Sequence, residues 1–416
     1  MNRFNYRGDE LMCESVPLQS IAEAVDTPAY VYSCTGIREN YRRIDRALES
    51  YPHLICYALK ANSNPEILRD LAALGSGADV VSGGELNLAL AAGFPAKKIV
   101  YAGVGKTDAE IRLAIENNIL ALNVESTQEL EVVAEIARKM GCTAPIALRI
   151  NPDIDIEGHP YLTTGKSANK FGIEIQQAKA CYQWAAKQSS LKIVGVHCHV
   201  GSMIRKSEPF SKSAETLVHF VADLKSMGIE MEHIDLGGGF GVDYQTVLAD
   251  QGSPWMLEPE AVIKEVLPVI QATGCELLFE PGRSIVGPNG ILLTRVLFAK
   301  ETKGKRFVVV DAAMNDLIRP SLYGAHHEVV PVRRRAGEQQ LVDVVGPICE
   351  SGDFLAKDRN LIEPQRGDLL AVMTAGAYGY TLASNYNSRS RGVEVGVEGE
   401  GWRIIRAREN WIQPSV

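Results

Sequence analysis

The amino-acid sequence predicts an α/β protein in which a (β/α)8 barrel of the TIM type is joined to a second, mostly antiparallel β domain. The chain has 416 residues, which is too long for one small hydrophobic core. Between residues 54 and 282, short β-branched runs alternate with amphipathic stretches of helical length, which is the pattern of a parallel α/β fold. After about residue 285, strand-like runs follow one another with no helical stretch between them.

Eight short apolar runs are the expected strands of the barrel. They are residues 54–60, 78–82, 98–103, 119–124, 144–151, 192–200, 232–238 and 275–282. Several of the stretches between them begin with Asn, Thr or Ser, which cap helix N-termini, and several end with Gly. Eight β-α units over about 250 residues have the size of a (β/α)8 barrel. A doubly wound open sheet is the alternative, but it usually has fewer strands.

The expected β domain contains five further runs. They are residues 291–300, 306–313, 340–349, 368–376 and 402–409. The N-terminal segment ends in PAYVYS, which precedes the barrel pattern and could add a strand to the same domain. We therefore expect a cofactor-binding barrel over residues 33–284 and a β domain over residues 1–32 and 285–416.

Composition excludes several classes of protein. The formal net charge of −8 argues against a nucleic acid or an acidic membrane as partner, because phosphate binding requires a basic face. No apolar run approaches the ~20 residues of a membrane span, and the N-terminus lacks the apolar core of a signal peptide. The eight cysteines form no C-x-x-C pair, so we expect reduced thiols and a cytoplasmic protein.

Chemistry in such barrels gathers at the C-terminal ends of the strands. The residues there are Lys60, Asp79, Arg149, His197, His199, Gly237 to Gly239, Glu280 and Arg283. A lysine, an imidazole, a glycine loop and a carboxylate are therefore expected on one rim. Asp79 and Arg149 could contact a ligand or support other side chains.

The sequence HIDLGGGFG (233–241) carries three successive glycines after a strand. Glycine lets backbone N–H groups approach an anion closely, and phosphate is the usual guest. A dinucleotide fingerprint would need Gly at position 242, where the chain has Val242. A tight strand-to-helix turn without a ligand is the alternative.

His197 and His199 are expected on the same face of one strand, because side chains alternate along a strand. Two such histidines could bind a metal, as in barrel hydrolases. Arg149 and Glu280 would complete the ligand set poorly, so no metal is expected. A buried, hydrogen-bonded imidazole or a flat ring used for stacking are the other interpretations.

Together, these groups match what pyridoxal phosphate requires. A lysine binds the cofactor aldehyde covalently, glycine amides hold the phosphate, and a carboxylate beside the ring nitrogen keeps it protonated. The sequence therefore predicts pyridoxal 5'-phosphate bound at Lys60, with Glu280 as the carboxylate.

Eight motifs, taken together, indicate a family. They are YALKAN, GADVVSGGEL, HCHVGS, DLGGGFG, EPGR, RPSLY, CESGD and GAYGY. In this order and spacing the chain closely resembles the fold-type III pyridoxal phosphate decarboxylases, from its N-terminal segment to its end. The resemblance implies an amino-acid decarboxylase that forms a homodimer, with the CESGD loop reaching the active site of the partner subunit.

The resemblance also implies a role for individual residues. The cofactor contacts would be Lys60, His199 stacked on the ring, Ser202, Gly238, Gly239, Glu280, Gly282, Arg283 and Tyr378. The substrate contacts would be Arg283, Arg319, Tyr323, Glu350 and Tyr378. Cys349 would donate the proton to the product, with the freed Lys60 as the alternative acid. Lys170, in the stretch YLTTGKSANKFG, would bind phosphate or order that loop.

The charges beyond the cofactor residues predict the substrate. Arg283 and Arg319 offer bidentate recognition of a carboxylate, while Glu350 offers an acceptor for an amine. A substrate with an amino-acid group at both ends fits this set, which predicts conversion of meso-diaminopimelate to L-lysine and CO2. Carboxynorspermidine, or another dibasic or carrier-bound amino acid, is the alternative. An alternative of another class is a small pyridoxal phosphate-binding regulator. Such a protein would lack the β domain that this sequence predicts.

Overall fold

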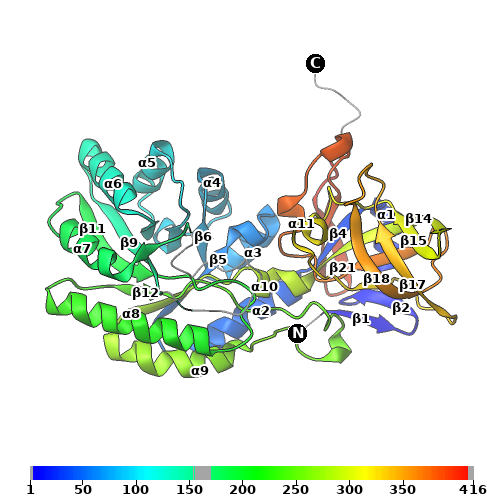
Figure 1. The fold of residues 1–416 in the computed structure, drawn as a ribbon, viewed down its shortest axis with the longest axis horizontal. Helices are drawn as coiled ribbons and strands as arrows, with labels where there is room; N and C mark the ends of the chain where they lie inside the picture. Colours follow the sequence, from blue (N-terminus) through cyan, green and yellow to red (C-terminus); the bar gives the residue numbers. More distant parts are fainter. Residues whose placement is uncertain (1–2, 153, 155–169, 411–416) are drawn as a thin grey trace, which may run out of the picture. The chain divides into compact units, whose positions relative to one another are not determined.

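The structure is a computed structural model, and it describes residues 3–152, 154 and 170–410. The chain divides into two compact units (Figure 1). The barrel unit comprises Tyr41–Gly241 and Trp255–Gly282, and the β unit comprises Met1–Asn40, Val242–Pro254 and Arg283–Val416. The domain boundaries expected from the sequence stay a prediction, and the compact units differ from them mainly because Val242–Pro254 belongs to the β unit.

The barrel unit contains a closed ring of eight parallel strands. They are β5 (His53–Ala58), β6 (Gly77–Val80), β7 (Ile99–Tyr101), β8 (Ala121–Val124), β9 (Ala144–Asn151), β11 (Leu191–His197), β12 (His233–Asp235) and β13 (Glu276–Phe279). Each strand pairs with its neighbour in the ring, and the pairing of β8 with β9 closes it. The predicted barrel is therefore confirmed. The short β10 (Ile173–Glu174) extends the sheet beside β9.

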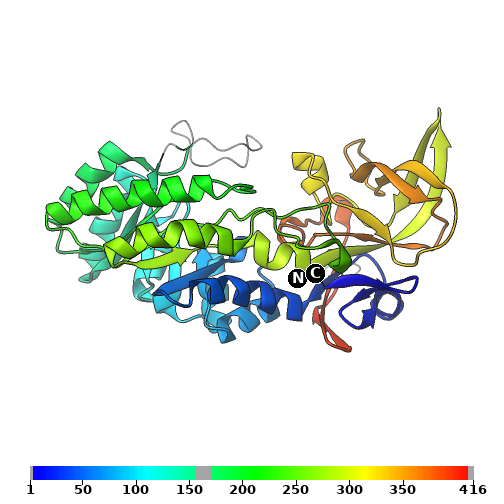
Figure 2. The same ribbon diagram turned by 90° about the horizontal axis from the view of Figure 1, so that it is seen from below.

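Amphipathic helices cover the outside of the barrel strands (Figures 1 and 2). They are α2 (Cys34–Leu48), α3 (Pro65–Ala73), α4 (Gly83–Ala91), α5 (Asp108–Glu116), α6 (Thr127–Met140), α7 (Ile175–Ala185), α8 (Glu208–Ser226) and α9 (Pro259–Ile270). Ser82, Thr107 and Ser126 cap α4, α5 and α6, because each side chain accepts a hydrogen bond from a first-turn amide. In both views α8 and α9 lie side by side.

A cluster of small and branched side chains fills part of the barrel unit's core. Its buried members are Leu54, Cys56, Val100, Ala121, Ala147, Val194 and Leu278, which come from six of the strands. A filled interior leaves no pore, so polar chemistry is confined to the ends of the strands.

The β unit is built on a sheet with the strand order β18-β17-β15-β14-β4-β20-β21. Its strands are β4 (Ala29–Ser33), β14 (Gly290–Thr302), β15 (Lys305–Val310), β17 (Gln339–Val345), β18 (Phe354–Ile362), β20 (Val393–Glu398) and β21 (Gly401–Arg406). Only the pairings β15–β17 and β4–β20 in this row are parallel, which confirms a mostly antiparallel domain. The N-terminal segment does add a strand, since β4 lies between β14 and β20.

Shorter elements complete the β unit. They are β1 (Phe4–Arg7), β2 (Glu10–Cys13), β3 (Val16–Pro17), α1 (Leu18–Val25), α10 (Arg283–Val286), α11 (Arg319–Tyr323), β16 (Val329–Pro331) and β19 (Leu369–Val372). β19 pairs with both β14 and β16. Buried residues of β4, β14, β19 and β20, such as Val31, Ile291, Ala371 and Val395, pack in one apolar cluster.

Two predicted positions at strand ends are wrong. β5 ends at Ala58, and Lys60 lies in the 3-10 turn Leu59–Ala61. β11 ends at His197, so His199 does not share a strand face with it. Both runs continue to be apolar after the ladder of hydrogen bonds stops, so their composition does not reveal where the strand ends.

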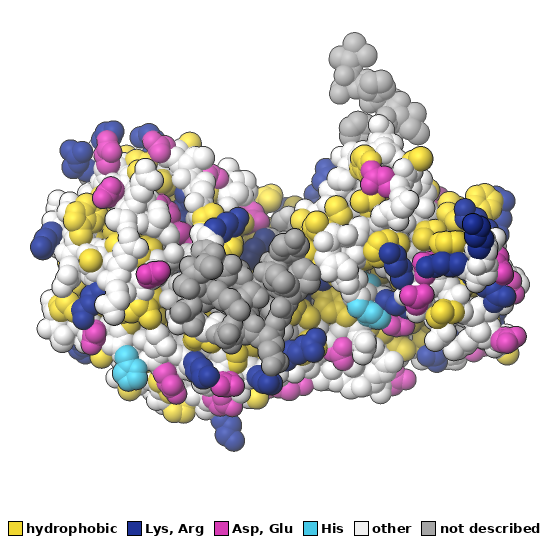
Figure 3. Space-filling model, in the orientation of Figure 1, with side chains coloured by type: hydrophobic (Ala, Val, Ile, Leu, Met, Phe, Trp, Pro, Cys, Tyr) yellow, Lys and Arg dark blue, Asp and Glu magenta, His cyan; other side chains and the backbone are white. Residues whose placement is uncertain are grey.

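On the face shown in Figure 3, acidic and basic side chains are interspersed over the barrel unit. No helix in the described part of the chain is long and apolar enough to cross a membrane.

Candidate active site

The barrel unit places Lys60 beside a buried carboxyl group. Ala58 of β5 is in register with Asp79 of β6, so the turn after β5 passes directly over that residue. The Lys60 Nζ donates a hydrogen bond to Asp79 Oδ2 at 2.5 Å. Asp79 is fully buried, whereas the Lys60 side chain is 40% exposed. The lysine amine is therefore held at a known place and still accessible to a ligand.

Glu280 follows β13 and lies in a buried cluster with His197 and Asp235. One ligand atom from each of the three residues lies within 4.8 Å of the others. Burial alone would raise the pKa of Glu280, but the neighbouring His197 at 3.4 Å and Lys60 outweigh it and lower that pKa. Burial and the nearby Glu280 raise the pKa of Asp235. Glu280 is therefore the member of the cluster that carries the negative charge.

This cluster bears on the metal alternative. Asp235 was not among the ligands expected from the sequence, and it gives the site a better metal-binding set than Arg149 and Glu280 would. The expected absence of a metal stays a prediction, which metal analysis of the purified protein can test.

The glycine loop after β12 contacts His199. The Gly238 amide donates to His199 Nδ1 at 3.1 Å, so that nitrogen is unprotonated. Burial, together with the charges of Arg149 and Lys60, lowers the pKa of His199 to about 3. The ring is therefore neutral at physiological pH. A neutral, planar imidazole can stack against a cofactor ring. Ser202 is half-buried in the same connection between β11 and α8.

The loop must consist of glycine for steric reasons. A Cβ on Gly238 would lie 2.3 Å from the Glu280 carbonyl oxygen, and one on Gly239 would lie 2.4 Å from the Gly201 carbonyl oxygen. Gly239 also has a φ of +113°, which other residues rarely adopt. Gly282 is also tightly packed, because a Cβ there would lie 2.9 Å from the Cβ of Ala61. Close packing of the backbone therefore accounts for the glycines at these positions.

These residues fit pyridoxal phosphate. Glu280 Oε1 is buried and has no hydrogen-bond partner in the described part of the chain, so it can accept one from a pyridine nitrogen. In the glycine loop the amides of Gly237 and Gly238 donate to Asp235 and His199, which fixes the loop beside the His199 ring, and Lys60 offers an amine. Each of the three parts that the cofactor requires is present in the barrel unit.

The β unit contains a second buried polar cluster around two arginines. Arg283 begins α10 and Arg319 begins α11, and the two side chains are only 8% and 6% exposed. Arg283 Nη1 donates to the Tyr244 hydroxyl at 2.6 Å, and its guanidinium lies 4.7 Å above the centre of the Tyr378 ring. Arg319 Nε donates to His327 Nε2 at 3.2 Å.

Neither arginine forms an ion pair with a carboxylate in the described part of the chain. Burial and the charge of Arg283 lower the pKa of Arg319, which shows that the two guanidinium groups repel each other. Two buried cations without a counterion form a site that an anion would stabilise.

Tyr378 has a φ of +56°, a strained conformation for a residue with a side chain, and its ring is half-buried. Tyr323 is also half-buried, at the end of α11, which begins with Arg319. The structure therefore brings Arg283, Arg319 and Tyr378 together in the β unit, with Tyr323 on the same helix as Arg319.

The CESGD loop is exposed at its first two residues. Cys349 and Glu350 are both exposed, and the Tyr386 hydroxyl donates to the Glu350 carboxylate. The buried Asp353 anchors the loop by accepting from the amides of Met314 and Ile348, both at 2.7 Å. The loop thus has a defined shape and presents Cys349 to its surroundings.

Arg149 and Lys170 have other partners. Arg149 forms a buried ion pair with Glu125 at 2.7 Å, and its guanidinium lies 4.6 Å above the centre of the Phe171 ring. Lys170 lies 5.2 Å from the same ring. Most of the predicted loop YLTTGKSANKFG, residues 161–169, lies outside the described residues.

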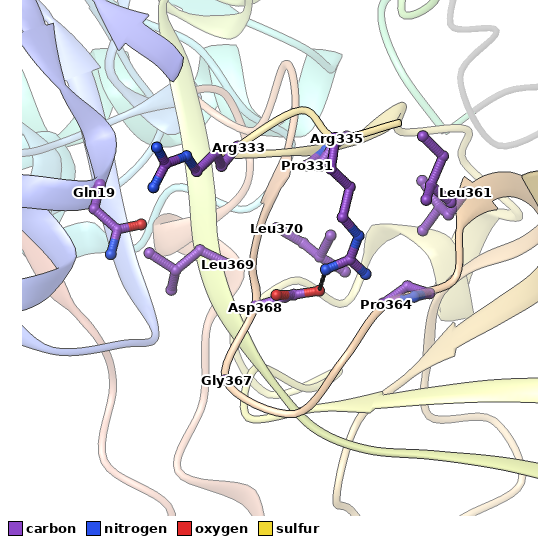
Figure 4. A pocket seen from close by; sticks show the side chains of 11 residues that line it. Gln19, Pro331, Arg333, Arg335, Leu361, Pro364, Gly367, Asp368, Leu369 and Leu370 are labelled. Atoms are coloured by element: carbon purple, nitrogen blue, oxygen red, sulfur yellow. Dashed lines mark ion pairs between the residues drawn. The ribbon is translucent and has the colours of Figure 1, made fainter. Parts of the chain in front are cut away.

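A cavity of about 240 Å³ within the β unit is not lined by any predicted site residue (Figure 4). Its lining residues are Gln19, Pro331, Arg333, Arg335, Leu361, Ile362, Pro364, Gly367, Asp368, Leu369 and Leu370. Arg335 and Asp368 form an ion pair at 2.9 Å inside it.

Sequence reasoning missed Asp235, Tyr244 and His327. Asp235 is the last residue of β12 and could have been found by its place before the glycine loop. Tyr244 and His327 carry no such signal, because they come from connecting segments that only the fold brings together.

The chain is similar to known proteins over its whole length. Residues 35–287 match the family described as pyridoxal-dependent decarboxylase, pyridoxal binding domain. A diaminopimelate decarboxylase of Aquifex aeolicus is 46% identical over 99% of this chain and 97% of its own. One of Pseudomonas aeruginosa is 49% identical over 98% and 97%. A crystal structure of diaminopimelate decarboxylase from Helicobacter pylori complexed with L-lysine has a TM-score of 0.89 at 41% identity, over 95% of this chain and 97% of that one.

Proposed function

The chain belongs to the pyridoxal-dependent decarboxylases, and we propose that within this family it converts meso-diaminopimelate to L-lysine and CO2. The observation that carries the substrate assignment is the pair of buried arginines, Arg283 and Arg319, which have no carboxylate partner in the described part of the chain. Relatives named diaminopimelate decarboxylase, and a related structure titled as a complex with L-lysine, support the same substrate and product.

The cofactor, when bound, supplies an acceptor for the electrons that remain on Cα after CO2 leaves. In this chain Lys60 is the residue that binds it covalently, and Asp79 holds the Lys60 amine. Glu280 retains its negative charge and keeps the ring nitrogen protonated, because His197 and Lys60 lower its pKa. His199, as a neutral ring, would stack on the cofactor, while Ser202, Gly238, Gly239 and Gly282 would hold its phosphate.

The β unit supplies recognition of the distal end of the substrate. Arg283 and Arg319 bind the distal carboxylate, and Glu350 binds the neighbouring amine. Tyr323 and Tyr378 complete the substrate contacts. A substrate that lacks the distal carboxylate leaves both guanidinium groups unneutralised.

Cys349 donates the proton to the product, and it does so in the active site of a partner subunit. The exposure of Cys349 supports this role, because in its own chain the thiol is accessible. The active form is accordingly a homodimer with shared sites. We place the enzyme in the cytoplasm, which the eight free cysteines support.

Steady-state kinetics on a panel of substrates tests this function. We expect kcat/KM for meso-diaminopimelate to exceed that for lysine or ornithine by a factor on the order of 10⁴, because buried polar groups reject an analogue that leaves them unpaired. Comparable efficiency on lysine and diaminopimelate would remove the substrate assignment. Preference for carboxynorspermidine would replace it with the alternative that the sequence left open.

A further inference from the structure

His327 contacts Arg319, and Tyr244 contacts both buried arginines of the β unit. His327 is fully buried directly before Glu328, eight residues after Arg319. Tyr244 comes from a separate segment, Val242–Pro254. Its ring meets the His327 ring edge-on, with centroids 5.1 Å apart and an interplanar angle of 86°. The two rings therefore form one wall against which the arginines lie.

The hydrogen bonds of His327 determine its protonation state. Its Nδ1 lies 2.9 Å from the Met373 carbonyl oxygen, which can only accept, so Nδ1 carries the proton. Its Nε2 lies 3.2 Å from Arg319 Nε, which can only donate, so Nε2 carries none. The imidazole is therefore neutral, in agreement with burial and the nearby Arg319, which lower the pKa of His327 to about 3.

The hydrogen bond to His327 determines which edge of the Arg319 guanidinium remains available to a substrate carboxylate. A guanidinium has five N–H donors, one on Nε and four on the two Nη atoms. His327 uses the Nε donor, so the Nη pair remains for a carboxylate. The Arg319 guanidinium also lies 5.3 Å above the centre of the Tyr244 ring, which stabilises its orientation.

Tyr244 acts on the other arginine. Its hydroxyl accepts from Arg283 Nη1 at 2.6 Å. Burial would raise the pKa of Tyr244, but Arg283 and Arg319 outweigh it and lower that pKa. Imidazole and phenol thus satisfy donors of both arginines without the full negative charge of a carboxylate, so the charge of the pair remains available to a ligand.

We propose that His327 and Tyr244 are positioning residues for Arg319 and Arg283. They orient the two guanidinium groups toward a substrate carboxylate without neutralising their positive charge. Arg319 then binds the carboxylate through its two Nη atoms. This inference rests on the proposed function, because it assumes that the two arginines bind the distal carboxylate. It adds that substrate specificity depends on neutral hydrogen-bond acceptors behind the arginines.

The test compares three histidine variants of the holoenzyme. His327→Leu removes the acceptor, and His327→Gln replaces Nε2 with an amide oxygen that can accept from Arg319 Nε. His326→Leu is the matched control, because the adjacent His326 contacts Glu328 and Arg359 and neither of the two arginines. For each variant we would measure kcat, KM for meso-diaminopimelate, the visible spectrum of bound cofactor, and inhibition by pimelate, an unreactive dicarboxylate.

We expect His327→Leu to raise KM and weaken pimelate binding about 10- to 100-fold, the effect of losing a hydrogen bond to a charged group. The cofactor spectrum and the thermal midpoint should stay close to those of His326→Leu, and His327→Gln should recover most of the loss. Tyr244→Phe should weaken pimelate binding to a similar extent, because it removes the hydroxyl that accepts from Arg283. Unchanged pimelate binding in His327→Leu, or an equal loss in His327→Gln, would overturn the proposal.

One further variant separates this proposal from the proposed function. Arg319→Leu must also weaken pimelate binding if the arginine binds a carboxylate. If it does not, the substrate assignment fails, whatever the histidine variants show. If Arg319→Leu weakens binding and His327→Leu does not, only the positioning role fails.

Discussion

The buried polar clusters of the two units differ in the charged groups that they contain. In the barrel unit, the carboxyl groups of Asp79, Asp235 and Glu280 gather near Lys60. In the β unit, Arg283 and Arg319 are buried beside a phenol and an imidazole, with no carboxylate in ion-pair contact in the described part of the chain. The first arrangement suits a protonated ring nitrogen and the second suits a carboxylate, which are the two kinds of group that the proposed function requires.

The two clusters also differ in how their geometry is maintained. The barrel cluster depends on the backbone, because the Gly237 amide holds Asp235 at 2.8 Å and the Gly238 amide holds His199. The arginine cluster depends on side chains from separate segments. We therefore expect substitutions of Lys60, His199 or Glu280 to change cofactor binding, and substitutions of Arg319 to change substrate selection.

Lys60→Ala should have the largest effect. It should remove the visible absorbance of the lysine-bound cofactor and nearly all turnover, because every later step begins from that bond. Lys98→Ala is a suitable control, because its amine donates to the exposed carbonyl of Gly75, just after α3. Retained absorbance and activity in Lys60→Ala would show that the barrel cluster has another purpose.

The alternative interpretation, in which His197, Asp235 and Glu280 bind a metal, predicts a different composition of the purified protein. It requires stoichiometric zinc or a similar ion in the purified protein and loss of activity with a chelator. Elemental analysis beside the Lys60→Ala spectrum would decide between the two.

Arg319→Leu should come next in size. Turnover of diaminopimelate should fall about 10²- to 10³-fold, because the distal carboxylate of the substrate loses one of the guanidinium groups that bind it. The cofactor spectrum should not change, since the contrast between the units assigns Arg319 to substrate alone. Arg295→Leu, on the β unit's strand β14, is a control with a partly exposed arginine. A lost cofactor spectrum in Arg319→Leu would contradict this division of labour.

Subunit exchange should give a smaller, partial effect. Lys60→Ala and Cys349→Ala are each expected to be inactive, and mixing them should restore about a quarter of the wild-type sites if each site uses both chains. Activity of the mixture, with exchange verified by differently tagged chains, is the measurement. No recovery after verified exchange would place Cys349 in its own subunit.

The smallest effect concerns stability in acid. His327 is neutral in the folded β unit with a pKa lowered to about 3, whereas an unfolded histidine has a pKa near 6.5. Below about pH 6.5 the unfolded chain binds more protons, so stability present above that pH is lost as the pH falls toward 3.

His327→Gln should therefore reduce the acid slope of the free energy of unfolding by up to about 1.4 kcal/mol per pH unit between roughly pH 4 and 6. Denaturant titrations at several pH values would measure it. His219→Gln, at an exposed histidine of α8, serves as control, and an equal change in that variant would contradict the assignment.

The barrel was predictable because its strands are buried on both faces and read as short, almost continuous apolar runs. β9 begins and ends where the sequence predicts, at Ala144 and Asn151. The β strands β18 and β20 were not predicted, because the first contains Lys357, Asp358 and Arg359 and the second contains Gly396. Charged residues or glycine interrupt the apolar run in both strands, although β20 is almost fully buried, so they lack the signal that reveals the barrel.

The candidate site was predictable where chemistry follows a strand. Lys60, the glycine loop and Glu280 each follow a barrel strand, so strand order places them together. Tyr244 lies 39 residues before Arg283, and His327 comes 44 residues after it. Only the folded β unit shows that these two rings support the arginines. The assigned roles of all these residues remain predictions for the experiments above.

The glycine loop has a consequence for protein engineering. Since Gly238 and Gly239 each face a carbonyl oxygen at a distance that no Cβ tolerates, every substitution there must displace the backbone around Glu280 or Gly201. A saturation library at these two positions should yield almost no functional clones. Substitutions at Tyr244 and His327 meet no such backbone oxygen, so libraries there should yield proteins that bind cofactor and differ in substrate binding. Laboratory evolution toward a new amino acid would therefore advance by accumulating changes behind the arginines, while the cofactor cradle stays invariant.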